Sequence, residues 1–208
     1  MKKLLILLFS IFFLSSSSVF ADDISEFQIE GISIGDSLLD YMTEDEILSE
    51  IERTKDYYLR LNEPNKYAHV YSWRDTPTYD DGLSFFVKNN STNKYISNKN
   101  EKYRILSVRG MMNFTEDFDA CLQKRDEIVE ILSGMFINTP KEEYSYSHSS
   151  DPSGNSIKDD VYFRFNSGDL IEVSCDNFEE TFRNKNNWTE GLNVVIRSAE
   201  ISEWITDR

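Results

Sequence analysis

Glycine, proline and cysteine are scarce in this chain, whose 208 residues include 8 Gly, 4 Pro and 2 Cys. This scarcity excludes collagen-like and low-complexity proteins, and a content of 39% hydrophobic residues excludes a fully disordered chain. Basic residues are also few, 22 against 37 acidic ones, which gives a formal net charge of −15. We therefore expect no nucleic-acid partner, because such binding depends on neutralising phosphates.

A hydrophobic run long enough to span a membrane is missing as well. Leu4 to Leu14 is almost entirely apolar, but it falls short of the roughly 20 residues that a spanning helix needs. Lys2 and Lys3 precede this run, and Val19-Phe20-Ala21 follows it as a cleavage site, which is the layout of a secretory signal peptide. We predict a signal peptide over residues 1–21, a single domain over 22–208 and no membrane anchor after cleavage, with a retained anchor as the alternative.

Export predicts a periplasmic or secreted protein. Loss of Lys2 and Lys3 would leave a net charge of −17. Such acidity repels anionic lipid and nucleic acid and attracts divalent or polyamine cations, although it also serves solubility alone. In an oxidising compartment Cys121 and Cys175 are expected to pair, with two free buried thiols as the alternative.

Both cysteines fall on apolar faces of predicted elements. Residues 115–133 repeat apolar side chains at helical spacing, and Cys121 lies on that face. Residues 170–175 alternate as a strand does, and Cys175 lies on its apolar face. We therefore predict a disulfide that joins a long helix to a sheet.

The remaining pattern predicts further strands and two more helices. A capping box at Thr43–Glu46 begins one helix, and residues 201–205 form a short closing helix. Strands are expected at 27–34 (with a bulge at Gly31), 67–73, 83–87, 103–108, 144–148, 161–165 and 192–196. This order predicts an α+β fold with an antiparallel sheet of about seven or eight strands and two main helices packed on one face, and it suggests two βαββ-like halves.

The tetrapeptide Gly35-Asp36-Ser37-Leu38 resembles the first block of the GDSL (SGNH) esterases, in which the serine is the nucleophile. Such a serine needs a histidine oriented by a carboxylate. The chain has only His69 and His148, and neither has an acidic residue three positions before it, as that family does. We therefore interpret the tetrapeptide as a turn that caps the next segment, and keep a hydrolase using Ser37 and His148 as the alternative.

A second polar cluster runs from His148 to Ser156 and could be imagined as a metal or hydrolytic site. Its Asp151-Pro152-Ser153-Gly154 sequence is typical of a type I β-turn, and its spacing matches no zinc or calcium motif. We predict a hairpin tip there, with a polar binding loop as the alternative. Paired acids such as Glu142-Glu143 and Asp159-Asp160 are interpreted as solvated surface.

Three stretches together carry a resemblance over most of the chain: 29–41, 148–156, and 196–200 with Trp204. They resemble a family of short secreted proteins from marine alphaproteobacteria. The resemblance implies the bacterial periplasm and no particular activity.

No complete catalytic set emerges from the sequence, and we expect no catalytic residue, metal site or cofactor. Tyr67, Tyr71 and Trp73 could line a groove for sugars or peptides, or could build the interior of the sheet. We therefore expect a soluble, monomeric, non-catalytic protein that binds a small solute or an envelope protein. The alternative is a secreted serine hydrolase of the GDSL type.

Overall fold

The computed structural model describes residues 24, 27–56, 66–73, 76–89 and 101–206. The predicted signal peptide, residues 1–21, lies outside this part of the chain. Among the described residues, none of the helices has the length and apolar character needed to cross a bilayer.

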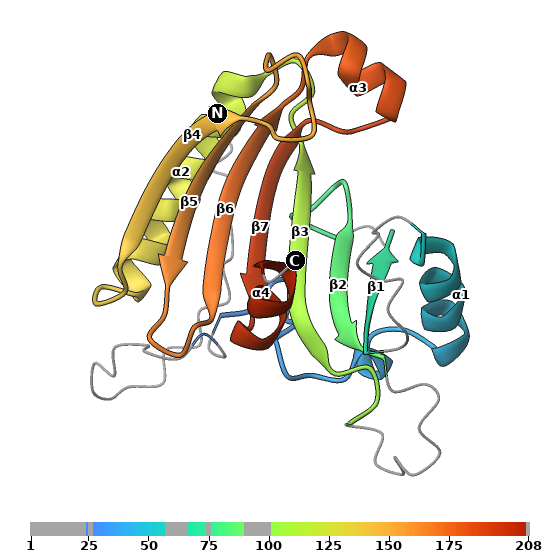
Figure 1. Ribbon diagram of the computed structural model, residues 1–208. Coiled ribbons are helices and arrows are strands. Elements are labelled where there is room, and N and C mark those ends of the chain that lie inside the picture. The colour runs from blue at the N-terminus through green and yellow to red at the C-terminus, as the bar shows by residue number, and fades with distance from the viewer. Residues whose placement is uncertain (1–23, 25–26, 57–65, 74–75, 90–100, 207–208) are drawn as a thin grey trace, which may run out of the picture.

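A seven-stranded antiparallel sheet organises the described residues (Figure 1), which confirms the predicted α+β fold. The strands lie side by side in the order β1-β2-β3-β7-β6-β5-β4. Their bounds are Tyr67–Ser72 (β1), Leu83–Lys88 (β2), Ile105–Asn113 (β3), Lys141–Ser147 (β4), Ile157–Arg164 (β5), Leu170–Asn177 (β6) and Gly191–Arg197 (β7).

The sheet is made of two meanders that meet at its centre, where β3 pairs with β7. Helix α1 (Glu44–Thr54) precedes the meander β1–β3, and helix α2 (Phe118–Met135) precedes the meander β4–β7. Each half therefore opens with a helix. The strand expected at 27–34 is absent, because Ile29 and Ile32 pair with each other across a turn whose Glu30 and Gly31 both have positive φ.

Helix α2 packs on β6 and β7 and buries one face of the sheet. Cys121 on α2 and Cys175 on β6 form a disulfide with their Cα atoms 6.0 Å apart, which confirms the predicted link between helix and sheet. Leu132 of α2 and Ile47 of α1 belong to the same hydrophobic core. Both main helices thus contribute to one apolar interior.

The two edges of the sheet differ. Helix α1 satisfies backbone groups of β1, since Thr54 Oγ1 donates to the carbonyl of His69 (2.6 Å) and the N–H of Tyr71 donates to Glu50 (3.2 Å). The capping box predicted at Thr43 and Glu46 begins this helix. At the opposite edge, the side chains of β4 are largely exposed.

Two short helices complete the described chain. Helix α4 (Ala199–Thr206) follows β7 and packs Ile201 against Tyr67 and Leu106, on the side of the sheet away from α2. Helix α3 (Glu180–Asn186) follows β6 and precedes β7 along the chain, and it was not predicted. It has no buried residue and hence no apolar stripe by which sequence could reveal it.

Replacing both cysteines (Cys121→Ala with Cys175→Ala) is expected to lower the free energy of unfolding by about 4 kcal/mol, because the disulfide closes a long loop in the unfolded chain. Urea-induced unfolding of the oxidised protein and the double variant measures the difference. The oxidised native protein should take up no iodoacetamide. Stoichiometric alkylation, or an unchanged unfolding free energy in the variant, would contradict this account.

Candidate functional site: a charged sheet face and an adjoining hollow

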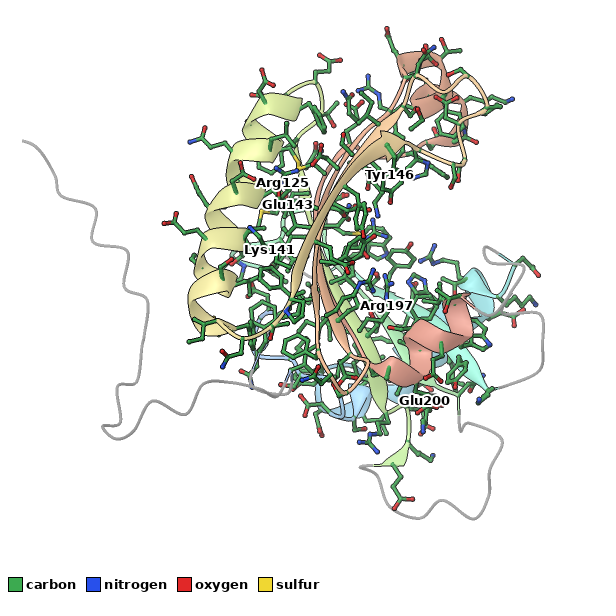
Figure 2. The ribbon with its side chains drawn as sticks, turned by 60° about the vertical axis from the view of Figure 1, so that its left-hand side comes forward. Arg125, Lys141, Glu143, Tyr146, Arg197 and Glu200 are labelled. Carbon is green, nitrogen blue, oxygen red and sulfur yellow. A yellow bond between two sulfur atoms is a disulfide. The ribbon has the colours of Figure 1, made fainter. Side chains whose placement is uncertain are left out.

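Over β5, β6 and β7, the side of the sheet away from α2 carries mainly charged and polar side chains. The apolar patch at α4 (Tyr67, Leu106 and Ile201) lies elsewhere on the same side. Figure 2 shows Tyr146 and Arg197 on this side, and Lys141 and Glu143 toward α2, where Arg125 lies. Because successive strand residues point to opposite faces, the register places a continuous polar set here. We call it the polar face; it comprises Arg109, Lys158, Asp160, Glu172, Ser174, Asp176, Asn193 and Arg197.

Lys158 holds the centre of the polar face together. Its Nζ lies 2.7 Å from Glu172 Oε1 and 3.1 Å from Asp160 Oδ1. Glu172 Oε2 lies 3.1 Å from Nη2 of Arg197, which extends the chain of ion pairs toward α4. Four side chains from three strands are thus fixed relative to one another.

Glu172 and Lys158 stay ionised although both are buried. Burial alone would raise the pKa of Glu172, but the cations of Lys158 and Arg197 outweigh it and lower the pKa below its ordinary value. Burial opposes the charge of Lys158 in the same way, and Glu172 and Asp160 outweigh it and raise its pKa. Each ion therefore depends on its neighbours to remain charged.

Two tyrosines cover the fully buried Asp160. The hydroxyl of Tyr162 donates to Asp160 Oδ2 at 2.8 Å, and the hydroxyl of Tyr146 donates to the same oxygen. Burial, together with the hydrogen bond to Asp160, raises the pKa of Tyr146 to about 12. Both phenols are therefore hydrogen-bond donors. The interpretation of Asp159-Asp160 as solvated surface is wrong for Asp160.

A second chain of hydrogen bonds runs toward the other end of the polar face. Arg109 Nε donates to Asn193 Oδ1, and Asn193 Nδ2 donates to Asp176 Oδ2, both at 2.8 Å. Four buried atoms of the polar face have no hydrogen-bond partner among the described residues. Asp160 Oδ1 is one of them, but it lies 3.1 Å from Lys158 Nζ in an ion pair. The other three, which make no ion pair within the described part of the chain either, are Ser174 Oγ, Asp176 Oδ1 and Arg197 Nε. Buried polar atoms are nearly always paired. Each of these three atoms can therefore form one further hydrogen bond.

A hollow of about 370 Å³ adjoins the polar face at Asp176. The first turn of α2, the end of β6 and helix α3 form its walls, with Phe114, Phe118, Phe178, Glu116, Glu180, Arg183 and Glu190 beside Asp176. Buried Glu190 fixes the walls. It accepts from the N–H groups of Phe178 and Glu116, both at 3.0 Å, and from Arg183 at 2.6 Å.

Ser37, the nucleophile of the hydrolase alternative, is 3% exposed. It caps the 3-10 helix η2 (Leu38–Asp40), and its hydroxyl donates to the carbonyl of Lys102 at 2.9 Å. Ser37 bridges to Arg104 just before β3 begins, whereas His148 follows β4 at the other end of the sheet. The structure does not bring Ser37 and His148 together.

The two histidines are parts of aromatic clusters. The ring of His69 lies 4.6 Å from that of Tyr71 and 4.7 Å from that of Phe86, between centroids. Burial, with Arg109 and Arg53 nearby, lowers the pKa of His69 to about 3. His148 packs against Phe178 and Trp188, and its burial lowers its pKa. Both imidazoles are neutral near physiological pH.

The loop from His148 to Ser156 joins β4 to β5, as expected for a hairpin tip. Asp151 is buried and accepts from the N–H groups of Ser153 and Ser156, both at 2.9 Å. Its carboxylate is therefore used inside the turn. Within the described ranges, no three His, Cys, Asp or Glu side chains are grouped to hold a metal ion.

No protein-family model matches this chain, and neither a curated protein nor a solved structure was found to match it. Sequence reasoning missed the polar face, although a signal was present. Lys158, Asp160 and Tyr162 alternate along β5, which begins earlier than the strand predicted at 161–165. Glu172 and Asp176 alternate along β6, which ends later than the strand predicted at 170–175. Polar alternation of this kind marks the side of a strand opposite its apolar one.

Asp176→Asn is expected to raise the free energy of unfolding by about 1 kcal/mol near pH 7, because it removes a buried, half-satisfied charge. Burial raises the pKa of Asp176 above its ordinary 3.8, against the lowering effect of Lys158, Arg109 and His148 and with the help of Asp160. The contribution of Asp176 to the free energy of unfolding therefore falls as pH rises from 3.8 through the higher pKa of the folded state.

The gain in Asp176→Asn should accordingly shrink as pH falls toward 3.8 and level off below it, where the wild-type carboxyl is protonated in both the folded and the unfolded state. Urea unfolding over this pH range measures it, with Glu142→Gln, an exposed carboxylate paired with Arg164, as control. A variant less stable than wild type at neutral pH would contradict the expectation.

Proposed function

We propose that this is a non-catalytic binding protein of the periplasm or secreted fraction that holds a small polar solute on the polar face and in the adjoining hollow. One observation carries the proposal: Ser174, Asp176 and Arg197 each keep a buried polar atom without a partner among the described residues. A buried polar group without a partner destabilises the fold. Residues that reduce stability in this way are typical of sites kept for function.

The charge of the polar face supports a solute rather than a large anionic partner. Arg109, Lys158 and Arg197 face Asp160, Glu172 and Asp176, so cations and carboxylates balance within the face. The hydrogen bonds and ion pairs between them fix their positions before any ligand arrives. Such preorganisation reduces the ordering cost of binding.

The edge strand β4 supports the proposal that the protein acts as a monomer. Lys141, Glu142 and Glu143 place charges along this exposed edge. Charged side chains on an edge strand disfavour pairing with another chain. An envelope protein as partner would need a different surface from this edge.

We expect at least one of four solutes, L-proline, glycine betaine, glucose or 1,4-diaminobutane, to raise the melting temperature by about 5 °C at saturation. Arg197→Gln should weaken or abolish the effect of a solute that contacts its guanidinium. Arg164→Gln is the matched control, because Arg164 is an exposed arginine of β5 on the same side of the sheet as Arg197. Differential scanning fluorimetry and calorimetry measure both.

Absence of any shift with all four solutes would contradict the binding proposal. The hydrolase alternative makes the opposite prediction: covalent labelling by a fluorophosphonate probe that is lost in Ser37→Ala. Labelling of that kind would replace the binding proposal with catalysis, and we expect none, because Ser37 donates its hydrogen to Lys102.

A further inference from the structure

We propose that the solute is a small organic cation with a primary ammonium group, of the diamine class, whose ammonium binds Asp176 at the wall of the hollow. This inference rests on the proposed function and names the class of ligand for the same site. Three independent features of the hollow support this inference: its negative charge, the buried Asp176 oxygen that lacks a hydrogen-bond partner among the described residues, and its aromatic wall.

The hollow is acidic, whereas the polar face beside it is balanced. Glu116, Asp176, Glu180 and Glu190 contribute four carboxylates, and Arg183 is the cation among the lining residues. Arg183 is already paired with Glu190 and Glu116. A positively charged ligand therefore meets a favourable field, strengthened by the formal net charge of −15.

An ammonium group would supply the hydrogen bond that Asp176 lacks among the described residues. It is 8% exposed, Asn193 occupies Oδ2, and Oδ1 has no hydrogen-bond partner among the described residues. An ammonium carries three donors and no acceptor, which suits an acceptor-only carboxylate. Hydrogen bonds between two ionised groups are also stronger than those between neutral ones.

The aromatic wall selects an organic cation over a metal ion. The rings of Phe114, Phe118 and Phe178 line the hollow. They can pack against methylene groups and attract a cation over their faces. In the part of the chain described, the carboxylates do not form a metal-ligating group, so a ligand long enough to reach separate carboxylates fits better.

The positive end of α2 does not oppose this ligand strongly. Asp117 caps the helix by accepting from the N–H of Ala120 at 3.1 Å, and Asp119 lies in the first turn. Negative side chains at this position offset the helix dipole. Phe118, between them, lines the hollow.

Isothermal titration calorimetry with 1,4-diaminobutane in about 150 mM salt tests the inference, because exposed charge pairs are screened under these conditions. One diamine should bind per chain, and 1,4-butanediol and Mg²⁺ should not compete. Asp176→Asn, which keeps the shape and the acceptor for Asn193, should weaken binding about tenfold or more. Glu142→Gln, away from the hollow, should bind as wild type does.

Equal affinity in Asp176→Asn, with folding verified by circular dichroism, would overturn the inference. So would competition by Mg²⁺, which would identify non-specific counter-ion binding. If 1,4-diaminobutane fails to bind while L-proline or glycine betaine binds in an Arg197-dependent way, the ligand class is wrong and the proposed function stands. If none of these solutes binds, both are wrong.

Discussion

The ion pairs that Lys158 makes with Asp160 and Glu172 determine how the sheet is used. An apolar helix face does not pack against a charged layer. Helix α2 therefore packs on the other side of the sheet, where Cys175 and Leu192 belong to the hydrophobic core. Among the described elements, the helix that packs against this side is α4, near one end of the polar face (Figure 2). Buried ion pairs contribute little net stability, because desolvation offsets their attraction. Their presence therefore fits a face organised for binding rather than for packing.

Strand β6 contributes both to the disulfide and to the polar face. Its Cys175 is tied to α2, while Ser174 and Asp176 point to the polar face. The disulfide therefore holds the strand that carries two of the three unpartnered buried atoms. Asp176 also lines the hollow, together with Phe118 in the first turn of the same helix α2. A ligand at Asp176 would contact both elements that the disulfide connects.

Much of the fold could be predicted because local patterns decide it. The apolar spacing around Cys121 and Cys175 predicted both the elements and their link, and the capping box at Thr43 and Glu46 predicted the start of α1. The polar face could not be predicted in the same way. Asp160 is buried by Tyr146, which is 14 residues away along the chain, and such a contact depends on strand pairing that no local pattern specifies.

The titration of Asp176 tests the central claim most directly, since it reports on the one carboxylate shared by the polar face and the hollow. Carbon-13 NMR of its side-chain carboxyl can follow the titration with and without 1,4-diaminobutane. The account predicts a midpoint above 3.8 in the free protein, and a lower midpoint once the diamine is bound. A carboxyl that titrates at its ordinary value, and does so equally in the presence of the diamine, would contradict it.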